Sequence, residues 1–523
     1  MPAAADGLGL WPPPGSVDIC PDTLLRFRLQ TGGMPRRVTI RTATGEPVVR
    51  IEPDGSGLAR RTVGGALDDR GLPHLFRYRP FEADSTGDLL TVHPPFPLRA
   101  STRYRIEVPG LDRDWTFRTR DQLPPSAERL RVAADGSADF CTVQGAIDAA
   151  PTNPSGPVII SVAQGHYREI CYITEDRPPM IIRGAGRGRT VISSDNNNRL
   201  NGAPSHSRSR LRRLGDRDLY NGWRAGVSVD APDVTFEDLT LINSTPAGGS
   251  QAEAYRGNHD RLLLNRVELF GHQDTLRMQG LGFLTDCLIS GTVDFVWGAG
   301  SAFHWRNEYR SRGPGYVLQV RNGAGEHGHV LRECRFTAGH GVPDAAVQIA
   351  RTDSTAFPHS EVILIDCTLD RHIDPQGYLI TGDPSAESVR FGEHGSLTPD
   401  GTVHDLARRH PGLRRLDPDE AARLRDPAEI LRGWVPRTVN AESERSDPGG
   451  QIVINWSAPP GHDRHDLVQL GDIAVPVESS ATLGALEITA PRRPGRYPIA
   501  FRSADRPNPG AAAVTSMIEV VDP

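Results

Sequence analysis

Two aspartates and two glutamines recur at similar intervals near the middle of the 523-residue chain. Asp294 follows Asp274 by about twenty residues, and Gln273 follows Gln251 by a nearly equal interval. If about twenty residues make one coil of a repeating fold, adjacent coils stack these side chains roughly 4.8 Å apart on one face. Two carboxylates this close cannot both ionise cheaply, so one is expected to hold a proton as a general acid while the other acts as nucleophile or base. The two carboxamides beside them are suited to holding a developing oxyanion.

This interpretation depends on the elements that carry the four residues, because a chain with many acidic residues also offers such spacings by coincidence. A strand-like pattern recurs in VTFEDLTLIN from Val234, LLLNRVELFG from Leu262, FLTDCLISG from Phe283, HVLRECRFTAG from His329 and VILIDCTLDRHI from Val362. Its register marks are Asp238, Arg266, Asp286, Glu333 and Asp366, and Asn307 divides the longest gap, which lies between Asp286 and Glu333. A recurrence of about twenty to thirty residues predicts a parallel β-helix, with a run of antiparallel hairpins as the alternative. In the β-helix, Cys287, Cys334 and Cys367 are expected to be stacked inward thiols.

The segments on either side of this repeat have a different sequence pattern. Short alternating strands separated by turns predict an N-terminal, Ig-like β-sandwich over 1–123 and a C-terminal β-sandwich over 448–523. The parallel β-helix is expected over 128–402. Over 403–447 we expect a helical connection, because Asp417 and Asp426 each place a capping residue before a proline. The predicted fold class is therefore all-β, a parallel β-helix flanked by two small β-sandwiches.

Composition excludes several kinds of chemistry. The chain contains no lysine, and its 59 arginines stand against 65 acidic residues for a net charge of −6. Schiff-base amine chemistry and a P-loop lysine are therefore excluded. A mildly acidic chain has no global field to attract nucleic acid, and no stretch approaches the roughly 18 apolar residues of a membrane helix. Six cysteines at wide intervals without a CxxC favour buried free thiols over a disulfide framework or a zinc site.

At the candidate residues the chain resembles the pectin methylesterases. QAEAYR from Gln251, GHQDTLRMQG from Gly271, ISGTVDFVWGAG from Ile289 and VAADGSADFCTVQGAIDAAP from Val132 are similar to four successive signatures of that family, in the same order and spacing. The resemblance covers roughly Leu130 to Ser396. It implies a right-handed parallel β-helix that hydrolyses the methyl esters of galacturonate units in pectin and releases methanol, with no metal and no cofactor.

The resemblance also implies a role for each motif residue. Asp294 would attack the ester carbonyl as the nucleophile. Asp274 would protonate the departing methanol and later take a proton from the hydrolytic water. Gln251 and Gln273 would line the oxyanion hole. Arg351 would hold the nucleophilic carboxylate in place, a role suited to a permanently charged, bidentate side chain.

One part of the family pattern is missing. Many members follow the equivalent arginine with proline and a sugar-stacking tryptophan, whereas Thr352 and Asp353 follow Arg351 here. Trp297 and Tyr378 are therefore the candidate substrate-binding aromatics, and a core position is the alternative for Trp297. The arginine-rich stretch SHSRSRLRRLGDRD from Ser205 is expected to be a solvated loop, or a cover that grips polyanionic pectin.

Three functions stay open at this stage. The first is demethylation of pectin, the second is the same chemistry on a small uronate or other methyl ester, and the third is a non-catalytic carbohydrate-binding β-helix. Polygalacturonases are excluded because their Arg-Ile-Lys motif needs a lysine. We expect pectin or another methyl-esterified uronate as the partner, no nucleic acid, no membrane and a monomer. The family implies secretion, but Met1 to Leu10 has neither a basic flank nor an apolar run, which favours the cytoplasm if Met1 is the native start.

Overall fold

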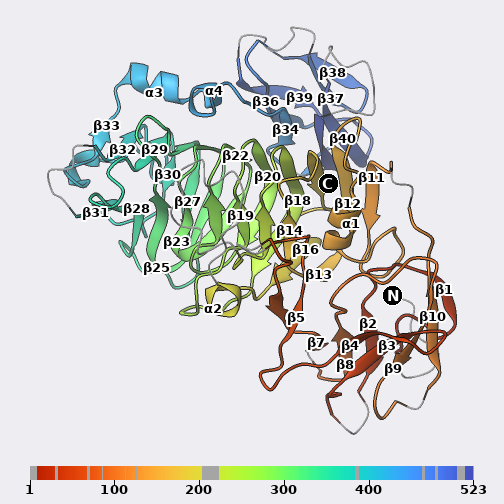
Figure 1. Cartoon of the computed structure of the whole chain (residues 1–523). Coiled ribbons are helices and arrows are strands. Elements are labelled where there is room, and N and C mark those ends of the chain that lie inside the picture. Colours follow the sequence, from red (N-terminus) through yellow and green to blue (C-terminus); the bar gives the residue numbers. More distant parts are fainter. Residues whose placement is uncertain are drawn as a thin grey trace.

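The computed structural model describes most of the chain (Figure 1). The described residues are 9–29, 33–67, 71–84, 86–111, 113–123, 126–202, 223–382, 388–443, 445–461, 466–477, 481–502 and 513–521, the last without side chains over 513–517. The arginine-rich stretch from Ser205 lies outside them.

The central body is a right-handed parallel β-helix, as predicted, and it runs through the yellow and green part of Figure 1. Its strands pair in parallel with the strands one coil before and after, which gives three sheets. The first sheet contains β11 (Arg129–Val132), β12 (Val158–Val162), β15 (Met180–Arg183), the first halves of β18 (Val234–Asn243) and β20 (Leu262–Phe270), β22 (Gly282–Thr285), β24 (Ala302–Trp305), β26 (His329–Arg332), β29 (Glu361–Ile365), β32 (Arg390–His394) and β33 (Arg414–Arg415).

The other two sheets follow the first around each coil. The second contains β13 (Gly165–Arg168), β16 (Thr190–Ser194), the second halves of β18 and β20, the first halves of β23 (Leu288–Gly298) and β25 (Glu308–Val320), β27 (Arg335–Ala338) and β30 (Thr368–Leu369). The third contains β14 (Cys171–Ile173), β17 (Val227–Val229), β19 (Tyr255–Gly257), β21 (Leu276–Met278), the second halves of β23 and β25, β28 (Val347–Asp353) and β31 (Tyr378–Thr381).

In six consecutive coils, the corner between the first and second sheets is made by one residue in the left-handed conformation. The register marks of the sequence pattern occupy this corner with φ between 51° and 55°; they are Asp238, Arg266, Asp286, Glu333 and Asp366. The sixth mark is Arg306 (φ 59°), so the prediction of Asn307 was wrong by one residue. The Asn307 side chain lies inside the coil, where its Oδ1 accepts from Cys287 N at 2.8 Å and its Nδ2 donates to Leu284 O at 3.1 Å.

The interior of the β-helix is an apolar column closed at its N-terminal end by α1 (Val143–Ala149), which is capped by Thr142. Cys287, Cys334 and Cys367 lie in this column as predicted, and all six cysteines are buried and free. Each of these three thiols donates to main-chain carbonyl oxygens of its own or a neighbouring coil. The cysteines therefore serve as small packing residues.

The two flanking sandwiches are also present (Figure 1, red to orange and dark blue). The N-terminal sheets are β1 (Ser16–Ile19), β10 (Trp115–Thr119), β9 (Arg103–Glu107), β3 (Val38–Thr42) and β4 (Pro47–Ile51), then β2 (Leu25–Arg28), β8 (Leu89–Val92) and β7 (Phe81–Ala83), with the pair β5 (Ala59–Arg61) and β6 (Phe76–Tyr78). The C-terminal sheets are β34 (Thr438–Ala441), β36 (Gln451–Ser457) and β39 (Leu483–Thr489), then β35 (Arg445–Ser446), β41 (Ala513–Val520), β40 (Gly495–Arg502), β37 (Leu467–Leu470) and β38 (Ile473–Pro476). Each sandwich has its own apolar core.

Short helices complete the chain. They are α2 (Asn198–Asn201), a 3-10 turn (Leu406–Arg408), α3 (Pro418–Leu424) and α4 (Pro427–Ile430). The predicted caps are present, since Asp417 accepts from Glu420 N at 2.8 Å and Asp426 accepts from Ala428 N at 2.9 Å. Both helices pack on the outer face of the first sheet, around Phe283, Phe303 and Trp305.

The domain limits stay predictions, although β34 lies within the predicted helical connection and already pairs with β36. None of the helices in the described ranges is long and apolar enough to cross a membrane.

Candidate active site

The two candidate aspartates meet at the corner between the second and third sheets. Asp274 precedes β21, and Asp294 lies within β23 where the strand register shifts after Gly291 and again after Val293. Gln273 forms a parallel bridge with Val293, and Asp274 N donates to Val293 O at 3.1 Å. Asp274 and Asp294 therefore occupy equivalent positions on neighbouring coils. Both residues are in the left-handed conformation, with φ values of 68° and 48°. This conformation interrupts the regular alternation of side chains between the two faces of the strand.

Arg351 holds the carboxylate of Asp294 from β28, two coils further on. Its Nε donates to Asp294 Oδ1 at 2.7 Å, and its Nη2 donates to Asp294 Oδ2. The guanidinium carbon lies 4.7 Å from the ring centroid of Tyr316, so an aromatic face supports the cation. The hydrogen bonds with Asp294 raise the pKa of Arg351. The Asp294 carboxylate, 4 % exposed, is thus fixed in a bidentate ion pair.

Asp274 has a different electrostatic environment. Burial raises the pKa of its carboxyl to about 7; Arg224 and Arg321 lower this pKa, while Glu253 and Asp294 raise it further. Near neutral pH the carboxyl therefore populates both its protonated and its ionised form. Both carboxyls of the pair thus contact an arginine, and Asp274 is able to carry a proton near neutral pH. That they act as acid and base stays a prediction.

A buried ion pair that sequence reasoning missed lies behind Asp274. Arg224 Nε donates to both carboxylate oxygens of Glu253 at 2.9 Å, and Arg224 Nη2 contacts Glu253 Oε1 at 2.8 Å. The same Nη2 donates to Asp274 Oδ2. Arg224 is 3 % and Glu253 0 % exposed, so the pair presents little net charge to Asp274. The one-coil spacing could have found Glu253, because it precedes Asp274 by the same offset that separates the paired residues Tyr255 and Leu276.

The two glutamines also lie on neighbouring coils at this corner. Ala252 N donates to Gln273 O at 3.3 Å, and Asn198 N donates to Gln251 O at 2.9 Å. Both side chains are half-buried. Within the described part of the chain, their hydrogen bonds run through the main chain, which leaves both carboxamides available to a ligand.

Trp297 lies beside the site, and the guanidinium groups of three arginines cover its ring. The guanidinium carbons of Arg277, Arg321 and Arg224 are 4.5, 4.9 and 5.4 Å from its ring centroid. The indole is only 3 % exposed, and its N–H has no hydrogen-bond partner among the described residues. The side chain therefore supports a layer of cations under the site and offers little ring surface to a sugar.

Tyr378 is not brought to the site. It pairs with Ala350 on β28, while its neighbour Leu379 pairs with Arg351. Because side chains alternate along a strand, Tyr378 points into the apolar column, where its ring centroid lies 5.3 Å from that of Phe391. At 1 % exposure it cannot contact a ligand on the surface, so its predicted role in substrate binding was wrong.

Among the described residues, one group has the composition of a metal site. Cys20, Asp22 and Cys141 bring their ligand atoms within 4.8 Å of one another at the joint between the N-terminal sandwich and α1. The Asp22 carboxylate already accepts from Cys141 N at 3.1 Å and from Thr142 N at 2.8 Å. These bonds give the group a structural role at the start of α1, far from Asp274 along the β-helix.

Comparisons with known proteins point to one family. The sequence profile described as Pectinesterase matches residues 129–431. "Probable pectinesterase/pectinesterase inhibitor 23" of Arabidopsis thaliana is 28% identical over 319 residues, which are 59% of this chain and 53% of that protein. "Pectinesterase 31" of the same plant is 30% identical over 296 residues, which are 56% of this chain and 89% of that protein. The chain spans about half the length of the first two curated relatives that it matches.

A solved structure, "Pectin methylesterase from Carrot", superimposes with a TM-score of 0.49 at 22% sequence identity. The match covers 58% of this chain and 93% of the carrot protein.

Proposed function

The chain belongs to the pectinesterase family, and from this membership and the geometry of its acidic pair we propose that it is a carboxylic-ester hydrolase. The proposed reaction is hydrolysis of the methyl esters of pectin, which yields pectate and methanol. The observation that carries the proposal is the difference between two neighbouring carboxyls, since Asp294 is ion-paired with Arg351 and burial raises the pKa of Asp274 to about 7.

In the proposed first step, an oxygen of the Asp294 carboxylate attacks the carbonyl carbon of the methyl ester. The bond to the methoxy oxygen breaks, and Asp274 gives its proton to that oxygen, so methanol leaves. The product of this step is an anhydride between Asp294 and the uronate carboxyl. Asp274, now ionised, is the base for the second step.

In the second step a water molecule takes the place that methanol has left. Asp274 removes one proton from the water as the water oxygen attacks the uronate carbonyl. The anhydride bond then breaks and both aspartates return to their starting protonation states. The uronic acid leaves and gives the second proton of the water to the solvent, which yields the uronate. The proton therefore moves from Asp274 to methanol and is replaced from water, which needs no other co-reactant.

The remaining side chains act on charge that develops during these steps. The free carboxamides of Gln251 and Gln273 would donate to the carbonyl oxygen as it becomes an oxyanion. Arg351 would keep both oxygens of Asp294 in a fixed plane, so that attack costs little reorientation. Arg224 would direct Asp274 by holding its Oδ2, which leaves Oδ1 for the proton.

The test is a methanol assay on highly methylated pectin, run beside a monomeric uronate methyl ester over pH 5 to 9. We expect methanol from the polymer at a higher kcat/KM than from the monomer, because contacts with sugar units beyond the reacting one can contribute binding energy to the transition state. No methanol from pectin at any pH would contradict the proposed function.

A further inference from the structure

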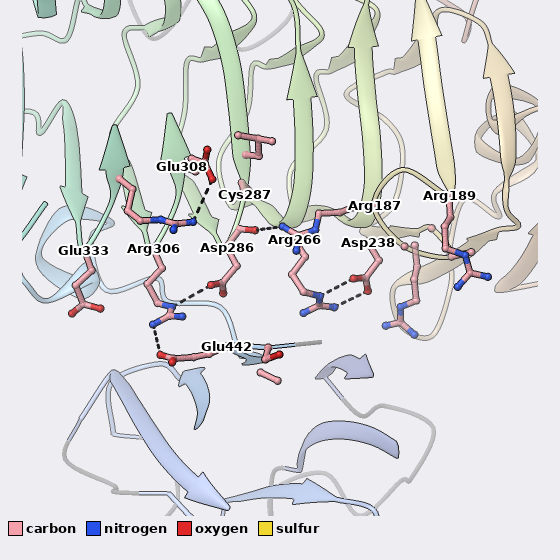
Figure 2. Close-up of a pocket in the computed structure, with 18 of the residues that line it drawn as sticks. Arg187, Arg189, Asp238, Arg266, Asp286, Cys287, Arg306, Glu308, Glu333 and Glu442 are labelled. Carbon is pink, nitrogen blue, oxygen red and sulfur yellow. Dashed lines mark hydrogen bonds and ion pairs between the residues drawn. The ribbon is translucent and has the colours of Figure 1, made fainter. Parts of the chain in front are cut away.

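A cavity lies at a different corner of the β-helix from the candidate active site. It has a volume of about 770 Å³ and faces the C-terminal sandwich at the corner between the first and second sheets (Figure 2). The catalytic candidates lie at the next corner, between the second and third sheets. The mechanism proposed above makes no use of this cavity.

One wall of the cavity is the row of left-handed corner residues. Figure 2 shows Asp238, Arg266, Asp286 and Arg306 side by side on successive coils, with their side chains directed toward the sandwich. Their charges alternate from coil to coil. Arg266 Nη2 lies 2.6 Å from Asp238 Oδ2, and Arg306 Nε lies 3.1 Å from Asp286 Oδ1.

The C-terminal sandwich supplies the opposite wall. Glu442 accepts from Arg306 Nη1 at 2.9 Å, which ties the two walls together. Ala441 and Ser443 lie beside it, and Arg496 reaches the cavity from β40. The cavity therefore exists only in the full chain, where the sandwich stands against the β-helix.

Arginine is in excess around the cavity. Seven arginines line it against five carboxylates, in a chain whose net charge is −6. Each of the five carboxylates is within ion-pair distance of an arginine: Asp238 with Arg266, Asp286 and Glu442 with Arg306, Glu308 with Arg310, and Glu333 with Arg332. The negative groups of the cavity are thus already engaged with cations. Four of the lining arginines are in turn paired with carboxylates, namely Arg183, Arg266, Arg306 and Arg335.

The exposed cations lie at the rim. Arg187 and Arg189 stand on a tight turn made by Gly186 and Gly188, which both have positive φ. Arg189 Nη2 donates to the neutral Oε1 of Gln164 at 3.2 Å, and Arg496 is exposed on β40. Guanidinium groups on opposite sides of a polar cavity can each take a carboxylate with two parallel hydrogen bonds.

We propose that this cavity binds a carboxylated oligosaccharide, the acidic product of demethylation, between the β-helix and the C-terminal sandwich. The proposal rests on the proposed function for the identity of the sugar. De-esterified pectin carries one carboxylate on every unit, which complements the excess of arginine, whereas the methyl ester is neutral. Binding here would keep the protein on a chain segment that it has already demethylated.

The first experiment is amide hydrogen exchange on the full chain with fully de-esterified tetragalacturonate. We expect protection of the amides in 184–190 and 439–443, and a loss of this protection as the salt concentration rises. The control ligand is the fully methyl-esterified tetramer, added to Asp294→Asn protein so that it is not hydrolysed. Absence of protection in these segments, or equal protection by the neutral ester, would overturn the proposal.

A pair of variants separates this cavity from the catalytic corner. Arg189→Gln with Arg496→Gln removes one exposed cation from each wall and should weaken binding at the cavity by about tenfold. Arg50→Gln with Arg60→Gln makes the same charge change on the N-terminal sandwich and should leave binding unchanged. Equal effects of the two pairs would indicate a general charge effect and refute the cavity site.

The methanol assay keeps this proposal apart from the proposed function. If methanol is released but the cavity segments are not protected by tetragalacturonate, the cavity proposal alone fails. If the segments are protected but no methanol is released at any pH, the proposed function fails and the cavity remains a site for acidic oligosaccharide.

Discussion

The carboxyl of Asp274 lies against two buried groups of opposite charge. Arg224 donates to it, and Glu253 takes two further hydrogen bonds from the same guanidinium. An arginine alone in this place would favour the ionised carboxylate, but the paired glutamate offsets its charge. The Arg224–Glu253 pair therefore orients the carboxyl of Asp274 by a hydrogen bond without placing a full positive charge beside it. The pKa of this carboxyl stays near neutrality.

Replacing Glu253 tests this balance. Glu253→Gln leaves the charge of Arg224 without a counter-charge, so the pKa of Asp274 should fall by about one unit. Because Asp274 acts first in its protonated form, activity declines as pH rises through this pKa, and the decline should move to lower pH in the variant. The measurement is kcat against pH, with the exposed Glu487→Gln as the control. A profile that coincides with the wild type would show that Glu253 has only a structural role.

The raised pKa of Asp274 also predicts a pH dependence of stability. A carboxyl with a higher pKa in the folded chain binds more protons when folded, so the folded state loses stability as pH rises from about 4 toward 7. Asp274→Asn cannot ionise. Its Tm should equal that of the wild type near pH 4 and exceed it by about 3 °C at pH 8. A Tm difference that does not change with pH would contradict the assigned pKa.

The site could be predicted from the sequence in part. The interval between Asp274 and Asp294 is about one coil, and it identifies the two residues as neighbours because consecutive coils here have similar lengths. Tyr378 could not be placed in this way, since a one-residue register decides whether a side chain faces the core or the surface. Arg224 also escaped prediction, because it lies two coils before Asp274 and the first of these two coils is longer than the second.

At the scale of elements, the corner residues turn the chain from the first sheet of the β-helix into the second. A single left-handed residue turns each of six consecutive coils, and all six of these residues are charged. Asp238 pairs with Arg266 and Asp286 with Arg306 along this row. The strand pattern predicted the coils and their lengths. It placed one corner at Asn307 instead of Arg306, because the inward hydrogen bonds of Asn307 cannot be inferred from spacing.

The packing of α3 and α4 on the first sheet gives a prediction at the same scale. Phe303 is 0 % exposed, and its ring stacks on that of Phe283 at 5.9 Å beneath the helices. Phe303→Ala should lower the free energy of unfolding by about 3–4 kcal/mol through lost burial and an unfilled cavity. Urea unfolding measures this change, with the exposed Val403→Ala as the control. A loss below about 1 kcal/mol would show that the helices do not depend on this contact.

At the scale of the whole molecule, the C-terminal sandwich is joined to the β-helix through buried polar contacts. Asn440, on β34, accepts from Arg266 and donates to Asn265 Oδ1 at 2.8 Å and to Asp286 Oδ2 at 2.6 Å. The row of corner residues thus forms an edge of the β-helix and also the surface that the C-terminal sandwich contacts. Sequence patterns predicted the sandwich but not this joint, because its partners lie far apart in the sequence.

Asn440→Leu should loosen this joint, because it leaves Arg266 and Asp286 without their amide partner. We expect two thermal transitions by calorimetry in place of one, with kcat on pectin within about twofold of the wild type, since the acidic pair lies at another corner. Gln451→Ala, an exposed change on the same sandwich, is the control. A single transition at the wild-type temperature would show that the joint contributes little.

The central claim is that the carboxylate of Asp294, held by Arg351, attacks the ester while Asp274 supplies the proton. The most direct measurement is methanol release from highly methylated pectin by Asp294→Asn, which keeps the size of the side chain and removes its nucleophilic charge. The account predicts a kcat at least about 10³-fold below that of the wild type, in a variant that still unfolds in a cooperative thermal transition at pH 5. A variant that retains more than about a tenth of the wild-type kcat would contradict it.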